Sequence, residues 1–494
     1  MTKFAIPDGS QLLRSNFLYG VATSSFQIEG DAASREKCIW DIFCEQEGTI
    51  LDKSNGIEAC KHVELWEDDV ALIDSMGFDA YRLSLSWPRI IKTDGSVNIK
   101  GIDFYKKLLK GLKSRNIKTF VTLYHWDLPQ SLEDNGGWLN RDTAFAFKRY
   151  TDVVVEALDG LVDSYATLNE PFCSSFLGYE IGTHAPGKTG RKLGRQSAHH
   201  LLLAHGLAMQ VLAQKSPHTK NGIVLNFTTA YAFSDTDQVA TERANQYFNH
   251  WYAQPLFDGK YPDVMYDLTE DERPDIEAGD MDIIAQPLDF LGVNFYTRNI
   301  FKDDGNGWFK EFENPDCERT DIGWEVHPEA LTDILVELNE RYDLPPIYIT
   351  ENGAATHDKV EDGVVNDSQR LRYYNAHLNA LHNAIKQGVA VSGYFAWSLM
   401  DNFEWAYGYT QRFGIVHVDF NTQIRTIKSP KPPRWHAFCT MEEYQSNGRV
   451  LHVSLLLPNS WVSLVPRPKI ACTVASSTCC RLQGRAAMTS GGTL

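Results

Sequence analysis

Eight short apolar runs recur along the chain, separated by longer segments with a helical pattern. Each run is seven or eight residues long and rich in β-branched and aromatic side chains, as expected for a strand buried on both faces. The segments between them, such as residues 101–116 and 368–388, place apolar residues three and four positions apart, which predicts amphipathic helices. The runs lie at residues 17–23, 80–87, 119–126, 163–170, 222–228, 290–297, 346–353 and 392–399.

The eightfold alternation of strand and helix predicts an α/β protein with a single (β/α)8, or TIM, barrel. Active sites of this fold form at the C-terminal ends of the strands. Arg82 lies inside its run, whereas polar or aromatic residues fall at or near six of the eight ends. Any one of them is compatible with a cap or core residue, but their coincidence favours a shared site. They are Trp87, His125, Trp126, Asn169, Glu170, Asn294, Tyr296, Glu351 and Trp397.

Two strand ends place a glutamate beside an asparagine, in TLNEP (167–171) and TENG (350–353). A charge buried there is costly unless the protein uses it. Two facing carboxyls can hydrolyse an acetal, because one protonates the leaving oxygen while the other meets the developing cation. A metal site is the alternative, but it needs further inward-facing carboxylates or histidines. The strand ends instead offer aromatic residues suited to the C–H faces of a sugar, namely Trp87, Trp126, Trp397 and Tyr296. We therefore expect no metal and no cofactor.

The composition and net charge of the chain limit the kinds of molecule that it is expected to bind. The 494 residues suffice for several small domains or one large barrel, and 43% hydrophobic with 22% charged residues is ordinary for a globular protein. The formal net charge of -17 argues against a nucleic-acid or anionic-membrane partner and favours a neutral small molecule. The N-terminus lacks a secretory pattern, no long uncharged apolar run occurs, and the nine cysteines lack paired CxxC spacing. We expect a cytoplasmic protein with reduced thiols and no membrane contact, and the sequence predicts no oligomeric state.

Several motifs, in order, resemble the glycoside hydrolase family 1 β-glucosidases over roughly residues 10–428. They are ATSSFQIEG (22–30), YRLSLSWPRI (81–90), VTLYHWDLPQ (121–130), TLNEP (167–171), DFLGVNFYTR (289–298), YITENG (348–353) and WSLMDNFEWAYGYTQRFG (397–414). The resemblance implies a (β/α)8 barrel and a retaining hydrolase that releases terminal β-D-glucosyl residues from β-glucosides and short oligosaccharides by double displacement.

The resemblance also implies a role for each matching residue. Glu170 would be the acid/base and Glu351 the nucleophile, with Arg82 and Tyr296 bonded to the nucleophile. An Arg near Glu351 would favour its anionic form, which in turn would raise the pKa of Glu170. The substrate-binding residues would be Asn169 at the 2-hydroxyl, Gln27, His125, Glu404 and Trp405 at the other hydroxyls, Trp397 as stacking platform, and Trp126 and Asn294 lining the site.

Glu404 bears on the choice among related activities. A carboxylate accepts hydrogen bonds from sugar hydroxyls but repels a phosphate, and family members that act on 6-phosphosugars typically have a Ser there. An unphosphorylated sugar is therefore favoured over the substrate of a 6-phospho-β-glycosidase. A β-galactosidase or β-fucosidase with the same two glutamates remains an alternative. So does a catalytically silent sugar-binding homologue, although such proteins lack one of the carboxylates and both are present here.

Three further features have simpler interpretations. His199, His200 and His205 lie on an apolar helical pattern and are expected to be packing or surface residues rather than ligands. Cys173 is expected to line the cleft as a small apolar group. From 451 to 494 the chain has no Asp or Glu but three of the nine cysteines, and it departs from the family pattern. We therefore predict a catalytic domain at 1–450 and an atypical tail, 451–494, outside the barrel.

Overall fold

Eight parallel strands form a closed barrel at the centre of the protein, whose computed structural model describes residues 5–428. In space the strands follow the order β5-β4-β3-β2-β1-β11-β8-β6, and β5 pairs with β6 to close the ring. The eight runs predicted from the sequence are these strands, so the predicted fold is confirmed. Their bounds are β1 (Leu18–Ala22), β2 (Ala80–Ser84), β3 (Lys118–Tyr124), β4 (Ser164–Asn169), β5 (Lys220–Ala232), β6 (Phe290–Asp303), β8 (Ile347–Asn352) and β11 (Val391–Trp397).

Side chains fill the interior of the barrel, as its closure requires. The Phe120 ring lies 4.9 Å from that of Phe395 and 5.3 Å from that of Tyr348, all three on different strands. Room for this aromatic layer comes from small neighbours. A Cβ on Gly20 of β1 would lie 2.4 Å from the Phe395 ring, so the residue at this position must be glycine.

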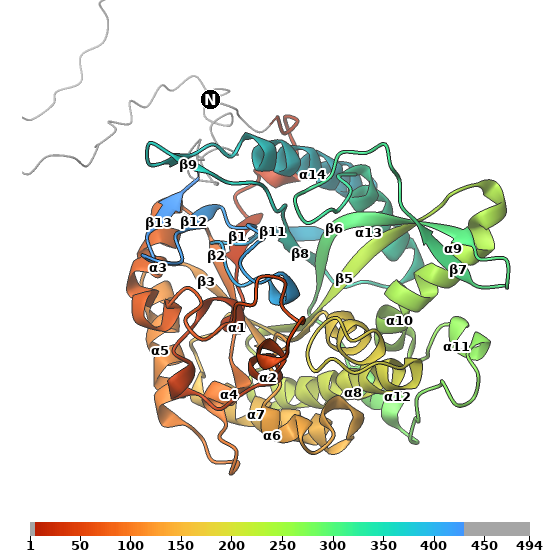
Figure 1. Cartoon of the computed structure of the whole chain (residues 1–494), viewed down its shortest axis with the longest axis horizontal. Helices are drawn as coiled ribbons and strands as arrows, with labels where there is room; N and C mark the ends of the chain where they lie inside the picture. Colours follow the sequence, from red (N-terminus) through yellow and green to blue (C-terminus); the bar gives the residue numbers. More distant parts are fainter. Residues whose placement is uncertain (1–4, 429–494) are drawn as a thin grey trace, which may run out of the picture. The chain divides into compact units, whose positions relative to one another are not determined.

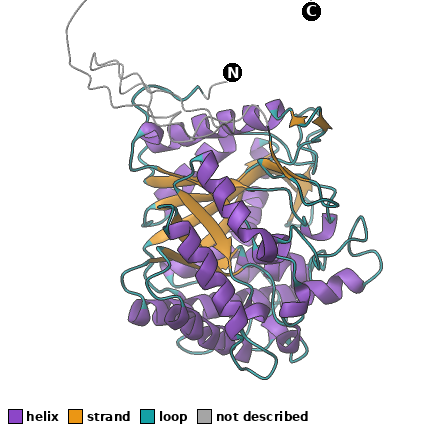
Figure 2. Ribbon diagram, turned by 90° about the vertical axis from the view of Figure 1, so that its left-hand side faces the viewer, coloured by secondary structure: helices purple, strands orange, loops and turns teal. Residues whose placement is uncertain are grey.

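The main helices lie outside the strands, as Figures 1 and 2 show. In α5 (Ile99–Lys113) the buried residues Ile102, Tyr105, Leu108, Leu109 and Leu112 recur at three- and four-residue spacing, as predicted. None of the helices within residues 5–428 is long and apolar enough to cross a membrane. The other long helices are α3 (His62–Met76), α7 (Asp142–Ala157), α8 (Arg191–Lys215), α9 (Gln238–Asn245), α10 (Trp251–Asp258), α13 (Glu329–Arg341) and α14 (Ser368–Lys386).

Short helices, turns and strands lie in the connections between the barrel strands and the long helices. The short helices are α1 (Ser25–Ile28), α2 (Ile39–Glu45), α4 (Trp87–Ile90), α6 (Gln130–Glu133), α11 (Val264–Asp267) and α12 (Asp280–Ile284), with π-helices η4 (Cys173–Glu180) and η6 (Gln246–His250). The 3-10 turns are η1 (Gln11–Leu13), η2 (Ala32–Ser34), η3 (Gly137–Leu139), η5 (Asp235–Asp237) and η7 (Trp405–Tyr407). The added strands are β7 (Phe309–Phe312), β9 (Val360–Glu361), β10 (Val364–Val365), β12 (Val416–Val418) and β13 (Arg425–Ile427).

The three histidines of α8 are packing residues, as predicted. All are buried, and each has a hydrogen-bond partner: the carboxylate of Asp280 lies 2.9 Å from His199 and the hydroxyl of Thr167 lies 2.7 Å from His205. His200 bonds the carbonyl oxygen of Trp138 at 2.9 Å. Within residues 5–428 no three His, Cys, Asp or Glu side chains are grouped as metal ligands.

Buried ion pairs tie the last described residues to the barrel. The ammonium of Lys428 lies 2.7 Å from a carboxylate oxygen of Asp401 and 2.5 Å from one of Asp358. Arg425 pairs with the buried Asp69 at 3.0 Å. Removing the cation from such a pair is costly because it leaves a buried carboxylate without its partner. The segment up to residue 428 is therefore part of the folded unit.

This predicts different consequences for two truncations. The predicted tail, 451–494, lies outside the described residues, and deleting it should leave the melting temperature of the purified protein unchanged. Ending the chain at residue 424 removes Arg425 and Lys428 and should lower the melting temperature by several degrees, because each broken buried pair costs roughly 3–5 kcal/mol. Thermal unfolding followed by circular dichroism measures both. An equal loss of stability from the two truncations would contradict the predicted boundary.

Candidate active site

A cavity of about 910 Å³ opens at the C-terminal ends of the strands, within the size range of small-molecule sites. Nine of the twelve predicted site residues line it: His125, Trp126, Glu170, Asn294, Tyr296, Glu351, Trp397, Glu404 and Trp405. The other three, Gln27, Arg82 and Asn169, are buried behind this lining and contact it through hydrogen bonds. The structure thus brings the predicted set together around one cavity.

Glu351, the last residue but one of strand β8, accepts hydrogen bonds on both carboxyl oxygens. Arg82 of β2 donates from Nη1 to Oε1 at 2.5 Å, and the Tyr296 hydroxyl of β6 donates to Oε2 at 2.7 Å. Arg82 is only 2% exposed, so little water screens its charge. The two donors fix the orientation of Glu351 and favour its anionic form.

Glu170 follows directly after β4 and has a backbone φ of 43°, in the left-handed region, so the chain turns sharply there. Asn294 of β6 donates from Nδ2 to Glu170 Oε1 at 2.6 Å. The orientation of this amide is set by Asn169, whose Oδ1 accepts from Arg82 Nη2 at 2.6 Å and from Asn294 Nδ2 at 3.0 Å. The hydroxyl of Thr350 then donates to Asn294 Oδ1 at 2.7 Å. Glu170 thus has no cation among its hydrogen-bond partners, in contrast to Glu351.

The two carboxyls differ in their electrostatic surroundings. Burial, and next the negative charge of Glu351, raise the pKa of Glu170 to about 7. Burial also raises the pKa of Glu351, but Arg82 and Tyr296 act in the opposite direction. Two buried carboxyls in one cavity do not both ionise readily. The contact with Arg82 makes Glu351 the one that carries the charge.

His125 lies between two aromatic residues on the other side of the cavity. Its ring is stacked on Trp397 at 5.8 Å and on Trp405 at 5.9 Å. Asn169 Nδ2 lies 3.1 Å from His125 Nε2, while Nδ1 is buried with no hydrogen-bond partner among the described residues. Burial lowers the pKa of His125, so the ring is neutral.

Gln27 and Glu404 form a second polar pair at the wall. Gln27 Nε2 lies 3.5 Å from Glu404 Oε2 and also donates to the carbonyl oxygen of Phe403 at 2.9 Å. Burial, and next the charges of Glu351 and Glu170, raise the pKa of Glu404 to about 8. The carboxyl therefore favours its protonated form near neutral pH, which differs from the carboxylate expected from the sequence.

One aromatic residue predicted for the site is not there. Trp87 begins α4, and its ring packs on Tyr150 at 5.0 Å and Phe147 at 5.5 Å, away from the cavity. Trp126 remains in the wall, and its indole N–H donates to the carbonyl oxygen of Asn169 at 2.9 Å.

Other lining residues were not predicted. Trp324, Ile322 and Glu311 come from the segment that follows β6, which has no strand-end motif to mark it. Cys173 lines the cavity as expected, but it also has a polar contact: its Sγ lies 3.0 Å from Glu170 Oε2. The three-residue spacing of Glu170 and Cys173 after a strand was the available signal for this contact.

Comparison with known proteins gives consistent matches. The sequence model of glycosyl hydrolase family 1 matches residues 10–440. A beta-glucosidase from Agrobacterium sp. is 47% identical over 424 residues, 84% of this chain and 92% of that protein. A bifunctional beta-D-glucosidase/beta-D-fucosidase from Bifidobacterium breve is 38% identical, covering 85% of this chain and 96% of the relative. Among solved structures, virulence factor SghA from Agrobacterium tumefaciens, in complex with its substrate analog salicin, has a TM-score of 0.83 and 45% identity, covering 86% of this chain and 96% of that chain.

The stretch matched by the family model includes every strand of the barrel and each residue that lines the cavity. The relatives are similar over nearly their whole length, so the likeness extends beyond the fold. The chain belongs to glycosyl hydrolase family 1.

Proposed function

We propose that the protein is a retaining β-glucosidase that releases terminal β-D-glucosyl residues from aryl and alkyl β-glucosides and short β-linked oligosaccharides. The observation that carries the proposal is the unequal environment of the two carboxyls: Glu351 has a guanidinium partner and Glu170 has none. Retaining hydrolysis needs such a pair, with one anionic and one protonated group. The beta-glucosidase relative and the salicin complex of SghA support this substrate class.

In the first step, Glu351 attacks the anomeric carbon while Glu170 gives its proton to the leaving oxygen. Arg82 and Tyr296 hold Glu351 so that one oxygen lone pair is free for attack. The positive charge that develops on the sugar ring is stabilised by the anionic carboxylate. The products of this step are a glycosyl ester on Glu351 and the free aglycone.

In the second step, water hydrolyses the ester. The charge of Glu351 is consumed in the ester, so one of the two causes that raise the pKa of Glu170 disappears. Glu170 then ionises more readily and accepts a proton from water as the water attacks. The glucose leaves with the β-configuration, because each of the two displacements inverts the anomeric carbon.

The wall opposite the carboxyls supplies sugar recognition. The Trp397 and Trp405 rings offer faces to the C–H surface of the sugar, while the His125 ring and the Glu404 carboxyl line the cavity as partners for its hydroxyls. We assign Gln27 the role of orienting Glu404, and Asn169 that of binding the 2-hydroxyl beside Arg82. Trp126 and Asn294 complete the lining.

The charge of the cavity favours an unphosphorylated sugar. Among the described residues that line it are four glutamates, namely Glu170, Glu311, Glu351 and Glu404, and no Lys or Arg. A phosphate would enter without a cation to receive it and would face these carboxyls, which is unfavourable at short range. This argument does not depend on whether Glu404 is ionised, because the missing feature is a positive partner.

A β-fucosidase activity is the second candidate. It is favoured by the bifunctional relative from Bifidobacterium breve, which acts on both sugars by its name. A β-fucoside differs from a β-glucoside at the 4- and 6-positions, whereas Glu351 and Glu170 act at the anomeric carbon. The same machinery therefore serves both sugars.

We also propose which residues form the catalytic domain and in which compartment the protein acts. Residues 1–450 form the catalytic domain, since the cavity and all eight barrel strands lie between residues 18 and 413. The described cysteines, Cys38, Cys44, Cys60, Cys173 and Cys317, are free thiols, which suits the reducing cytoplasm. We propose that short oligosaccharides derived from cellulose are among its substrates.

The reaction class is tested by following the first-formed product. Hydrolysis of an aryl β-glucoside, observed by proton NMR at once after mixing, should give β-glucose first and α-glucose only later by mutarotation. Early appearance of α-glucose contradicts the retaining mechanism, and absence of hydrolysis contradicts the proposed function.

The roles of the two glutamates are tested by their opposite response to azide. Glu351→Gly should abolish turnover, and azide entering the vacated space should give the α-glycosyl azide. Glu170→Ala should still form the glycosyl ester from substrates with a good leaving group, but lose the base for water. Azide needs no base, so it should speed this variant and give the β-glycosyl azide. The same anomer from both variants, or an α product from Glu170→Ala, would exchange the two roles.

The charge argument is tested with 4-nitrophenyl β-glucoside and its 6-phosphate. We expect kcat/KM for the phosphorylated sugar to be lower by about a hundredfold or more, because one uncompensated buried charge costs several kcal/mol. Glu404→Ser should reduce activity on the plain glucoside and narrow this ratio. Equal kcat/KM values for the two substrates contradict the proposed preference for an unphosphorylated sugar.

A further inference from the structure

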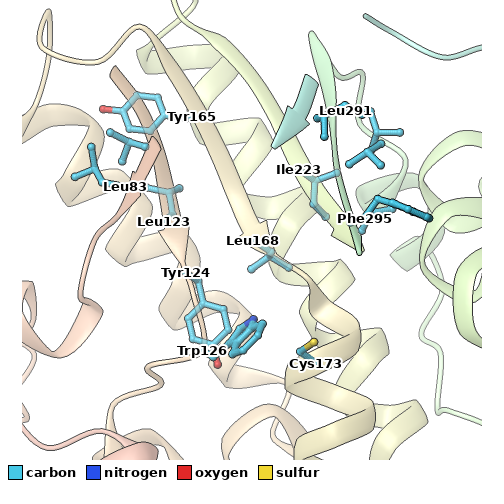
Figure 3. Close-up of a cluster of buried hydrophobic side chains, with 14 of the residues drawn as sticks. Leu83, Leu123, Tyr124, Trp126, Tyr165, Leu168, Cys173, Ile223, Leu291 and Phe295 are labelled. Atoms are coloured by element: carbon cyan, nitrogen blue, oxygen red, sulfur yellow. The ribbon is translucent and has the colours of Figure 1, made fainter. Parts of the chain in front are cut away.

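Cys173 occupies an unusual position for a thiol that the reaction scheme does not use. It is the first residue of η4 and lies three residues after Glu170, whose carbonyl oxygen accepts a hydrogen bond from the Cys173 amide at 2.9 Å. Its side chain is 8% exposed, and its Sγ lies 3.0 Å from Glu170 Oε2. Figure 3 shows Cys173 and Trp126 at the same end of the hydrophobic cluster, beyond Leu168 of β4.

The contact involves the oxygen that carries the catalytic proton. Asn294 donates its amide hydrogen to Glu170 Oε1. The reverse orientation of that amide is excluded because Asn294 Nδ2 also donates at 3.0 Å to Asn169 Oδ1, an oxygen whose position is fixed by a hydrogen bond from Arg82 Nη2. An oxygen that accepts a strong amide hydrogen bond is the carbonyl oxygen of a neutral carboxyl. The proton of Glu170 therefore lies on Oε2, beside the sulfur of Cys173.

The thiol can act only as a hydrogen-bond donor to the anionic form of Glu170. Burial, and next the charge of Glu170, raise the pKa of Cys173 well above its usual value, so the sulfur keeps its proton. An S–H group is a weak donor, but a charged acceptor strengthens the bond. When Glu170 is neutral, Oε2 is a hydroxyl oxygen whose proton faces the glycosidic oxygen, and it accepts the bond from the thiol much more weakly than the anion does. The contact thus favours the ionised state over the protonated one.

We infer that Cys173 is a positioning residue that balances Glu170 between its acid and base roles by donating its S–H to Oε2 of the ionised carboxyl. The inference rests on the proposed function of Glu170. Without this donor, the cavity offers the anion of Glu170 the single hydrogen bond from Asn294 among the described contacts. The base needed for the second step would then be harder to form.

Other charged and titratable groups around Glu170 also affect its pKa. Glu351 of β8 repels the anion, while Arg82 of β2 attracts it. Glu404, in the loop after β11, has a pKa raised to about 8 and adds repulsion only at the higher pH where it ionises. Tyr296 of β6 is held by Glu351, and burial raises its pKa well above the usual value, so it stays neutral. None of these groups is altered by a substitution at Cys173, so a shift in that variant reports the thiol itself.

The test is the pH dependence of kcat/KM for cellobiose, whose poor leaving group requires the proton of Glu170. The basic limb of that profile reports the loss of this proton in the free enzyme and should lie near pH 7 in the wild type. Cys173→Ala removes the donor and should move the limb to higher pH by about 0.5–1 unit. Cys173→Ser supplies a stronger O–H donor and should move it to lower pH by a similar amount.

Two controls separate this effect from packing. Cys60→Ser makes the same change at another buried thiol, which donates to the carbonyl oxygen of Asp401 at 3.2 Å and does not contact Glu170, so its limb should match the wild type. Melting temperatures identify variants that lose the fold. The inference is overturned if the basic limb of the kcat/KM profile stays in place in both Cys173 variants, or moves in the same direction in both.

A second substrate isolates the base role. With 2,4-dinitrophenyl β-glucoside the first step needs little acid help, so hydrolysis of the ester limits kcat. Cys173→Ala should then move the acidic limb of the kcat profile to higher pH and leave kcat unchanged above that limb. The limb should lie below pH 7, because the ester has removed the charge of Glu351 that raises the pKa of Glu170. A uniform loss at every pH would assign Cys173 a packing role only. Failure of the proposed function is distinct, because the wild type would then cleave neither substrate.

Discussion

The buried ion pair between Arg82 and Glu351 is the constraint on which the site depends. Three carboxyls, Glu170, Glu351 and Glu404, are buried around one cavity, and charged groups in such surroundings are costly without a partner. Arg82 supplies one positive charge, and it contacts only one of the three directly. The ion pair thereby selects Glu351 as the anion and leaves the other two carboxyls with raised pKa values.

The same arginine links the two catalytic candidates through the barrel. Its Nη2 donates to Asn169 Oδ1 at 2.6 Å, and that oxygen also accepts from Asn294 Nδ2, which bonds Glu170. Strands β2, β4, β6 and β8 each contribute one or more members of this network. Because closure of the barrel fixes these strands relative to one another, side chains far apart in sequence hold each other in one geometry. The network explains why Arg82 and Asn169 lie behind the cavity wall and still belong to the site.

Prediction from the sequence succeeded where a residue's place follows from strand periodicity. The eight strands, and residues such as Glu351 and Trp397 at their ends, follow from short apolar runs and from the rule for the C-terminal face. The prediction that Trp87 lies at the site was wrong because the chain turns into α4 at that point, with Pro88 at the second position of the helix. The ring of Trp87 then packs on Tyr150 in the helix layer. Trp324 could not be predicted, since it lies in a loop whose path is set by tertiary contacts and which no period marks. Glu311 lies in β7, a short strand antiparallel to β6 that no apolar run marks in the sequence. The three-residue spacing of Glu170 and Cys173 was a signal for their contact, but the left-handed backbone at Glu170 is not visible in the sequence.

The shared burial of the carboxyls also gives the reaction its order. Before the sugar reacts, the cavity holds one anion balanced by one guanidinium, so a neutral sugar enters an environment without net charge from this pair. Attack by Glu351 converts that anion to a neutral ester and leaves Arg82 uncompensated. The site then favours a new negative charge nearby, and Glu170 is the carboxyl positioned to acquire it as it gives up its proton. The acid of the first step becomes the base of the second because the first step itself moves the charge.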